Sequence, residues 1–319
     1  MSYLNLQRVY DMTIQLDEAL YLEMLSMPRG TQELQEDFIS EYLSRWDFVR
    51  DGYGNVYIAI EQEEEGAIND VAFMSHIDTV HRSDLVEVDV CAKGGFAFVP
   101  EGADANCLGA DCTTGIWIML NMIENKVPGL YCFFLDEEVG CLGSQWAADN
   151  LSWDNINHAI SFDRYGTTSI ITHQMGVNTA SKEFAEELSE RFYYEGLPYQ
   201  PDDGGVYTDS NSFVNVINNC TNISVGYYSQ HTRAERQDLN FLIELIDVCC
   251  SIDWSGLPIG TLIDDSYDYD EYYTQYSFGA LYELEELMWD NPRLEEDVRE
   301  LIEKYKSDDD KLNDPFYAG

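Results

Sequence analysis

Apolar runs and amphipathic stretches alternate along the first 250 residues of the chain. Short runs rich in β-branched and aromatic residues predict strands, and they lie at 56–60, 71–76, 129–135, 159–162 and 222–226. Stretches with apolar residues three and four positions apart predict helices, and they lie at 14–27, 31–46, 114–124 and 235–250. Residues 86–100 alternate well enough to predict a β-hairpin.

This alternation of strands with helices predicts an α/β fold with three layers, α/β/α, built around a mixed and mostly parallel sheet. The stretch 129–135 is apolar throughout, as expected of a strand that is covered on both faces. In such folds functional sites gather beyond the carboxyl ends of the strands. Polar residues that end the predicted strands are therefore the first candidates for chemistry.

The pattern changes after about residue 253. Residues 264–276 are rich in Tyr, Asp and Glu, and two acidic helical stretches follow at 278–290 and 293–306. We predict a main domain over residues 1–253 and an acidic, Tyr-rich segment with C-terminal helices over 254–319. The tail from Ser307 is expected to fray.

Acidic side chains dominate the charge, since 60 Asp and Glu against 17 Lys and Arg give a formal net charge of -43. Such a surface repels phosphate backbones and anionic membranes, so we expect neither nucleic acid nor a membrane as partner. Hydrophobic residues make up 45% of the chain, which indicates a folded globular protein and not a disordered polyacid.

The sequence shows no secretory signal and no apolar stretch long enough to cross a bilayer. Its eight cysteines are scattered and form no CxxC pair. Reduced thiols used as small core residues are the expected interpretation. We therefore expect a cytoplasmic protein.

Five residues that can bind metal ions end the predicted strands or lie just beyond one of the apolar stretches. They are His76, Asp111, Glu138, Asp163 and His231. Imidazole and carboxylate groups are the ligands that zinc takes in many enzymes. A further carboxylate, Glu137, directly precedes the candidate ligand Glu138, and a general base is required at such a position next to the metal. The apolar strand predicted over 129–135 ends just before this pair of glutamates. Charged groups without a partner are unfavourable at the end of a buried strand, so this position favours a functional role.

Hydrolysis of an amide at neutral pH requires a polarised carbonyl, an activated water and a proton carrier. Two divalent ions about 3.5–4 Å apart can supply the first two, and a carboxylate that bridges the ions offsets their repulsion. Each ion then needs roughly two further protein ligands and one position open to water. Five ligands, one of them bridging, satisfy this requirement, so the pattern predicts a two-metal hydrolase.

Most of the chain from residue 14 to 250 resembles the co-catalytic zinc exopeptidases, the M20, M28 and M42 metallopeptidases. The resemblance rests on motifs that follow one another in the order Gly54-Asn55-Val56, His76-Ile77-Asp78, Gly109-Ala110-Asp111, Asp136-Glu137-Glu138-Val139-Gly140, Ser161-Phe162-Asp163 and His231-Thr232 with Glu235. It implies the zinc-exopeptidase fold, which is phosphorylase/hydrolase-like. It also implies two divalent metal ions, in the first place Zn²⁺, with Mn²⁺ or Co²⁺ as alternatives.

The same resemblance implies a role for each matching residue. It makes Glu137 the general base and Asp78 the residue that orients the imidazole of His76. The implied ligands are His76 and Asp163 on one ion, Glu138 and His231 on the other, and Asp111 on both.

The separation of two motif residues distinguishes among the subfamilies. Asp163 and His231 are 68 positions apart, which is too few for the lid or dimerisation domain that the M20 group usually places there. The segment 204–210, Gly-Gly-Val-Tyr-Thr-Asp-Ser, resembles compact M28-like enzymes. We therefore expect residues 1–253 to be a catalytic domain without an inserted lid. The chain departs from the family at Cys112, where a second acid is frequent.

Two further residues are candidates for substrate contacts. Asp209 is placed to recognise a substrate amine, although Thr208-Asp209-Ser210 equally suits an ordinary turn or helix cap. Arg164 directly follows a candidate ligand, which is less expected in the family, and it suits pairing with a substrate carboxylate.

These observations favour an aminopeptidase or dipeptidase that cleaves short peptides and that is free to form an oligomer. One alternative is an N-acyl amino acid deacylase or carboxypeptidase, in which the same metal centre acts on an acyl-amino-acid substrate. Another is a catalytically silent metal-binding interaction protein. The presence of Glu137 argues against a catalytically silent protein, since a site without activity does not need a general base.

Overall fold

The computed structural model describes residues 17–62 and 69–260. These residues lie in the first of two compact units, Met1–Ile263, and the second unit is Asp264–Gly319. The helices predicted over 278–290 and 293–306 fall outside the described residues, as do the first positions of the helix predicted over 14–27.

An eight-stranded sheet forms the centre of the fold, in the order β1-β2-β6-β3-β7-β12-β8-β11. The strands are β1 (Val49–Arg50), β2 (Val56–Ile60), β3 (Val71–His76), β6 (Gly129–Phe134), β7 (His158–Arg164), β8 (Ser169–Ile171), β11 (Gln200–Asp202) and β12 (Asn219–Ser224). The four central strands β6, β3, β7 and β12 are parallel to one another, and β2 lies antiparallel to β6. The predicted mixed, mostly parallel sheet is thus confirmed.

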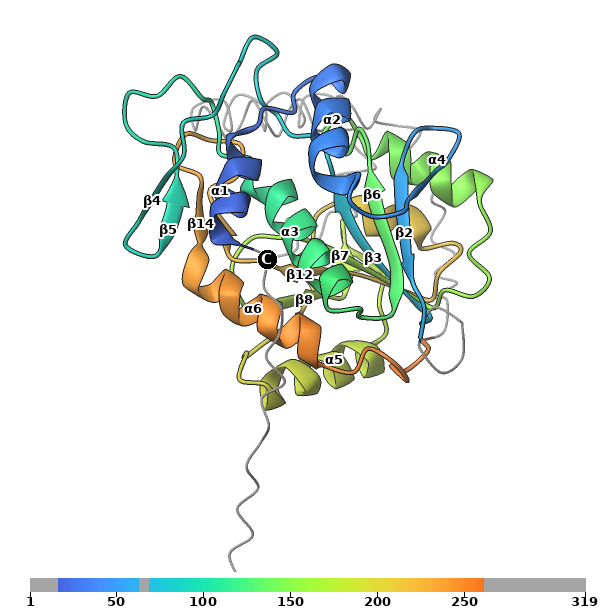
Figure 1. Ribbon diagram of the computed structural model, residues 1–319. Helices are drawn as coiled ribbons and strands as arrows, with labels where there is room; N and C mark the ends of the chain where they lie inside the picture. The colour runs from blue at the N-terminus through green and yellow to red at the C-terminus, as the bar shows by residue number, and fades with distance from the viewer. Residues whose placement is uncertain (1–16, 63–68, 261–319) are drawn as a thin grey trace, which may run out of the picture. The chain divides into compact units, whose positions relative to one another are not determined.

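Helices cover both faces of this sheet (Figure 1). The helices are α1 (Glu18–Ser26), α2 (Gln32–Phe38) with its π-helical extension η1 (Ile39–Leu43), α3 (Ala110–Glu124), α4 (Leu142–Asn150), α5 (Lys182–Tyr194), the short 3-10 helix η2 (Asp209–Phe213) and α6 (Leu239–Ser251). Residues of α1, α3, α5 and α6 belong to the larger hydrophobic core, whereas α4 and η2 contribute to a smaller one on the other face. The α/β/α layering expected from the sequence is present.

Alternation along the strands decides which side chains reach each layer. In β3, Val71 and Phe73 belong to the larger core, and Ala72 and Met74 belong to the smaller one. His76 continues the second series at the end of the strand. Because β3, β6 and β7 are parallel, their carboxyl ends meet at one edge of the sheet, and the candidate residues gather there.

Smaller sheets accompany the large one. The strands β4 (Cys91–Lys93), β5 (Phe96–Phe98), β13 (Tyr227–Tyr228) and β14 (Arg236–Asp238) form a sheet in the order β13-β14-β5-β4. Its β4–β5 pair is the hairpin that was predicted over 86–100. A second short pair joins β9 (His173–Gln174) to β10 (Val177–Asn178).

Some boundaries differ from the prediction. Helix α3 begins at Ala110 and not at Thr114, so Asp111 lies in its first turn, where a negative charge suits the helix dipole. The helix predicted over 235–250 begins only at Leu239, because residues 236–238 pair with β5. The side chain of Asp238 then caps α6 by accepting the backbone N–H groups of Asn240 and Phe241.

The sequence analysis did not predict the helices α4 and α5. The buried residues of α4 are small, namely Gly143, Ser144 and Ala147, whereas α5 buries Phe184, Ala185, Leu188 and Phe192. Among the helices of the described residues, none combines the length and the apolar character that a membrane-spanning segment requires.

Candidate metal centre

The candidate residues reach the carboxyl edge of the sheet from different elements. His76 is the last residue of β3, and Asp163 lies near the end of β7. Glu137 and Glu138 follow β6 in the turn that leads to α4, and Asp111 comes from the first turn of α3. His231 lies between β13 and β14.

One group of three side chains is formed by Asp111, Glu138 and His231, whose potential ligand atoms all lie within 4.8 Å of one another. The Nε2 atom of His231 is 2.8 Å from Oδ2 of Asp111 and 3.0 Å from Oε1 of Glu138. Residues 93 and 120 positions away in the sequence therefore meet at a single imidazole nitrogen.

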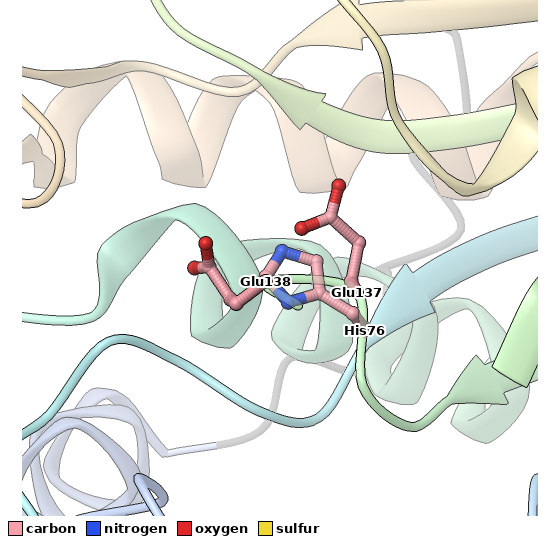
Figure 2. A group of neighbouring side chains, drawn as sticks. All are labelled: His76, Glu137 and Glu138. Atoms are coloured by element: carbon pink, nitrogen blue, oxygen red, sulfur yellow. The ribbon is translucent and has the colours of Figure 1, made fainter. Parts of the chain in front are cut away.

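A second group contains His76, Glu137 and Glu138, again with all potential ligand atoms within 4.8 Å. Figure 2 shows the imidazole of His76 beside the two glutamate side chains. The Nε2 atom of His76 is also 3.8 Å from Oδ1 of Asp163. Glu138 belongs to both groups, so the two candidate sites are neighbours.

Asp78 connects the end of β3 to the turn after β6. Its two carboxylate oxygens each accept a backbone N–H, from Glu137 and from Glu138, at 3.0 Å. The Nδ1 atom of His76 faces the main-chain carbonyl of Asp78 at 3.0 Å, whereas the carboxylate is farther away, at 3.6 Å. The carboxylate of Asp78 thus orients the double-glutamate turn, and its main-chain carbonyl lies closest to the imidazole.

Asp163 is fixed by two polar contacts that the sequence did not reveal. The hydroxyl of Thr208 donates to its Oδ2 at 2.7 Å, and its backbone N–H donates to Oδ1 of Asn222 at 3.0 Å. Thr208 belongs to the segment 204–210, and its contact brings this segment to the candidate metal centre. Asn222 lies in β12, which pairs with β7 in parallel, and this pairing brings its side chain to Asp163.

Backbone strain accompanies two of these positions. Asp136, just before the double glutamate, and His231 have φ of 60° and 61°. A left-handed conformation of a residue other than glycine costs about 1–3 kcal/mol and persists where the surroundings fix it. Both residues lie where side chains converge on the candidate metal centre.

Burial and the neighbouring charged groups shift the pKa values of these side chains. Burial raises the pKa of Glu138 to about 7, and His231 opposes the shift. Burial likewise raises the pKa of Glu137 well above its usual value, against the influence of His76. Burial lowers the pKa of His231, but the nearby Glu138 and Asp111 more than offset this and raise it well above its usual value. The raised pKa values mean that the two glutamates disfavour their ionised forms without further positive charge, which a bound cation would supply.

These residues suit divalent metal ions. Imidazole nitrogens and carboxylate oxygens, the atoms that zinc binds in many enzymes, lie within 4.8 Å of one another in each group. Oε2 of Glu138 is buried and has no hydrogen-bond partner among the described residues, and a buried polar atom of this kind calls for a partner. A cation between the side chains would supply that partner and compensate the clustered charge.

Arg29, which lies between α1 and α2, contacts the first turn of α3 beside Asp111. Arg29 is fully buried, and its Nη2 lies 3.2 Å from Sγ of Cys112 and also donates to the hydroxyl of Thr113. Its guanidinium carbon lies 4.3 Å from the centre of the Phe38 ring. A positive charge thus lies next to the thiol of Cys112.

The two predicted substrate residues are both buried. Arg164 donates from Nη2 to the carbonyl of Gly204 at 2.8 Å, and its guanidinium lies over the ring of Tyr165. Neither carboxylate oxygen of Asp209 has a hydrogen bond of normal geometry to a described residue. Burial raises the pKa of Asp209 to about 7, which the neighbouring His76 and Ser144 oppose. Their roles toward substrate stay predictions.

Comparisons with known proteins place this geometry in a structural context. No protein-family model matches the sequence, and no curated protein is significantly similar to it. Among solved structures, aminopeptidase PepT from Bacillus cereus ATCC 10987 is 14% identical, with a TM-score of 0.60 over 73% of this chain and 96% of PepT. A tripeptidase from Staphylococcus aureus subsp. aureus Mu50 is also 14% identical, with a TM-score of 0.59 over 73% of this chain and 95% of its own.

The TET1 peptidase of Pyrococcus horikoshii, which can assemble into a tetrahedron or a large octahedral shell, shares the fold as well. It is 16% identical, with a TM-score of 0.54 over 73% of this chain and 98% of its own. The chain therefore has the fold of the co-catalytic zinc exopeptidases, and the resemblance expected from the motifs is confirmed at the level of the fold.

Proposed function

We propose that this protein, which has the fold of metallo-exopeptidases, is a two-metal hydrolase that cleaves amide bonds in short peptides as an aminopeptidase or dipeptidase. The observation that carries the proposal is the pair of three-residue groups that share Glu138 at the carboxyl edge of the sheet. A peptidase fold alone is compatible with many activities. The converging candidate ligands and the adjacent carboxylate of Glu137 favour metal-dependent hydrolysis among these activities.

The proposed ligand arrangement is the one that the motif resemblance implies, and distances in the structure support parts of it. His231 and Glu138 would hold one ion and His76 and Asp163 the other, while Asp111 would bridge both. The short contacts of His231 with Asp111 and Glu138 support the first set. The 3.8 Å separation of His76 from Asp163 supports the second, because it leaves room for an ion between them. Zinc is the ion we propose, although manganese and cobalt suit the same ligands.

Glu137 is the proposed general base. When bound, the two divalent ions supply a polarised substrate carbonyl and a water of lowered pKa. A carboxylate oxygen of Glu137 would accept a proton from the attacking water as the water oxygen bonds to the carbonyl carbon, and it would then deliver this proton to the leaving nitrogen as the C–N bond breaks. The raised pKa of Glu137 suits a group that must both accept and release a proton.

Replacement of the base tests this assignment. The substitution Glu137→Gln keeps the shape of the side chain and removes its basicity, so turnover should fall by at least about 100-fold while bound metal stays near the wild-type amount. Glu124→Gln, which changes a carboxylate that pairs with Arg45 at the surface, serves as the matched control. Turnover of the Glu137→Gln protein at the wild-type rate would show that another group is the base.

A substrate panel separates the proposed peptidase from the alternatives. Aminoacyl-amides, dipeptides and N-acetyl amino acids should be offered to the metal-loaded protein. Cleavage of the first two classes supports the proposal, whereas cleavage of N-acetyl amino acids alone indicates a deacylase. Bound metal without hydrolysis of any class indicates a silent binding protein.

We also propose that residues 1–253 form the catalytic domain without an inserted lid. Between Asp163 and His231, the described chain contributes strands β8, β11 and β12 to the main sheet and α5 to its cover. This use of the segment supports the proposal, because it leaves little chain for a separate domain.

A further inference from the structure

Glu235 is a buried carboxylate outside the proposed ligand set. It is 1% exposed, and its oxygens accept three backbone N–H groups from the start of α3. Oε2 accepts from Leu108 at 2.8 Å and from Gly109 at 3.0 Å, and Oε1 accepts from Ala110 at 2.7 Å. These amides lie immediately before Asp111 in the chain.

The burial of the Glu235 side chain carries a cost in free energy. Burial of a carboxylate costs several kcal/mol unless hydrogen bonds or opposite charge compensate it. Among the described residues, Glu235 has no ion pair. Burial and the nearby Asp111 raise its pKa to about 8, and the amides at the N-terminus of α3 oppose this shift by favouring the ionised form. Such amides are the unpaired donors of a helix, and together with the helix dipole they favour a negative charge. Because Glu235 depends on these three amides, its side chain also restricts the position of the backbone at residues 108–110.

The contact links the two sides of the proposed metal centre. Glu235 follows His231 by four positions, and the imidazole of His231 reaches Oδ2 of Asp111 at 2.8 Å. One short segment thus carries the imidazole and also holds the backbone from which the opposing carboxylate projects. Both members of the pair are placed by the same piece of chain.

We propose that Glu235 is the positioning residue for Asp111, and that it holds this carboxylate in place for the two metal ions. The inference rests on the proposed function, since it assigns Glu235 a role at the same metal centre. Glu235 itself touches neither substrate nor metal in this account. It acts by fixing residues 108–110.

The substitution Glu235→Gln tests the role with a minimal change of shape. The remaining carbonyl oxygen can keep the two amides at Leu108 and Gly109, which turns the new NH₂ group toward the N–H of Ala110. Two donors then face each other at the residue next to Asp111. Loss of an interaction that orients a metal ligand typically lowers metal affinity about 10–100-fold, and we expect that loss for the more weakly held ion.

A matched control comes from the same segment. Asp238 is also a carboxylate that accepts backbone N–H groups at a helix start, but it caps α6 and not α3. The substitution Asp238→Asn should leave the affinity for both ions within about twofold of wild type, since it does not touch the Asp111 loop. Both variants and the wild type are titrated with Co²⁺ after metal removal, and their thermal unfolding is recorded in parallel.

The outcomes separate the inference from the proposed function. A wild-type protein that fails to bind two ions contradicts the two-metal function itself. A wild type that binds two ions, with Glu235→Gln equal to it in affinity, overturns the role of Glu235 and leaves the function standing. A lowered affinity in Glu235→Gln, but not in Asp238→Asn, supports the role.

A measurement on the unaltered protein covers the case in which Glu235→Gln does not fold. Hydrogen exchange of the backbone amides at Leu108, Gly109 and Ala110 is followed in metal-free wild-type protein. If Glu235 holds this loop in advance of metal binding, these amides are protected without metal. Exchange at the rate of exposed amides until metal is added would overturn the inference.

Discussion

The substitution Asp78→Asn perturbs the turn that presents both glutamates. The two oxygens of Asp78 accept the N–H groups of Glu137 and Glu138, each at 3.0 Å. An asparagine keeps one acceptor and directs its NH₂ group at the other amide. The nearer partner of the His76 imidazole is the main-chain carbonyl of residue 78, which the substitution leaves in place. The effect should therefore reach the metal centre through the glutamate turn.

The expected magnitude follows from these contacts. Loss of one hydrogen bond to a charged group costs about 1.5–3 kcal/mol. With a shift of about 2–4 °C per kcal/mol for a chain of this size, the Tm should fall by roughly 3–12 °C. Metal affinity should fall about 10–100-fold, as is usual for partners that orient metal ligands.

Metal titration by isothermal calorimetry, together with thermal unfolding, measures both effects. Ser181→Ala is the control, because it removes the side-chain cap of α5 far along the chain from the candidate residues. Loss of a cap costs about 0.5–2 kcal/mol, so the control should unfold earlier and still bind metal like wild type. If Asp78→Asn loses stability but keeps wild-type metal affinity, the assigned role of this carboxylate is wrong.

Three further predictions follow from the same structure. Thr208→Val removes the hydroxyl that holds Oδ2 of Asp163, so the affinity for one ion should fall about tenfold; a titration in which both ions bind as in wild type would speak against it. Removal of metal by a chelator leaves the clustered carboxylates uncompensated, and zinc at 100 times its Kd should restore about 2.7 kcal/mol of stability per site; a Tm that does not respond to zinc contradicts this. Burial lowers the pKa of His158 from 6.5 to about 4, so the unfolded chain takes up a proton in that interval that the folded protein does not. Stability should therefore be complete above pH 6.5, fall as the pH drops toward 4 and level off below; at about 1.4 kcal/mol per pKa unit the loss is ~3 kcal/mol. Urea unfolding of His158→Gln should show a shallower decline, and a decline parallel to that of wild type would contradict the assignment.

Local patterns were enough to predict the central fold. The strand over 71–76 was placed correctly because every one of its residues is buried, so its apolar character is continuous. Helix α3 was placed too late because Thr113 and Thr114 look like a helix start, yet both are fully buried inside the helix. Their hydroxyls find partners in distant residues, such as Gln237 for Thr114.

Contacts between residues far apart in the sequence limited how much of the candidate site could be predicted. Motif residues such as His76 and Glu138 could be selected from the sequence, because each ends an apolar strand or lies just beyond one. The contact of Glu235 with the start of α3 joins residues at least 125 positions apart, and its sequence surroundings predicted a helix. The helix was predicted to begin at Glu235, whereas residues 236–238 form β14 and pair with β5, and Glu235 directly before them is buried.

Location of the bound ions tests the central claim most directly. Anomalous diffraction from crystals of the zinc-loaded protein should give two peaks about 3.5–4 Å apart, one beside His231 and Glu138, one beside His76 and Asp163, with the carboxylate of Asp111 between them. A single peak, or peaks away from these side chains, would contradict a two-metal centre.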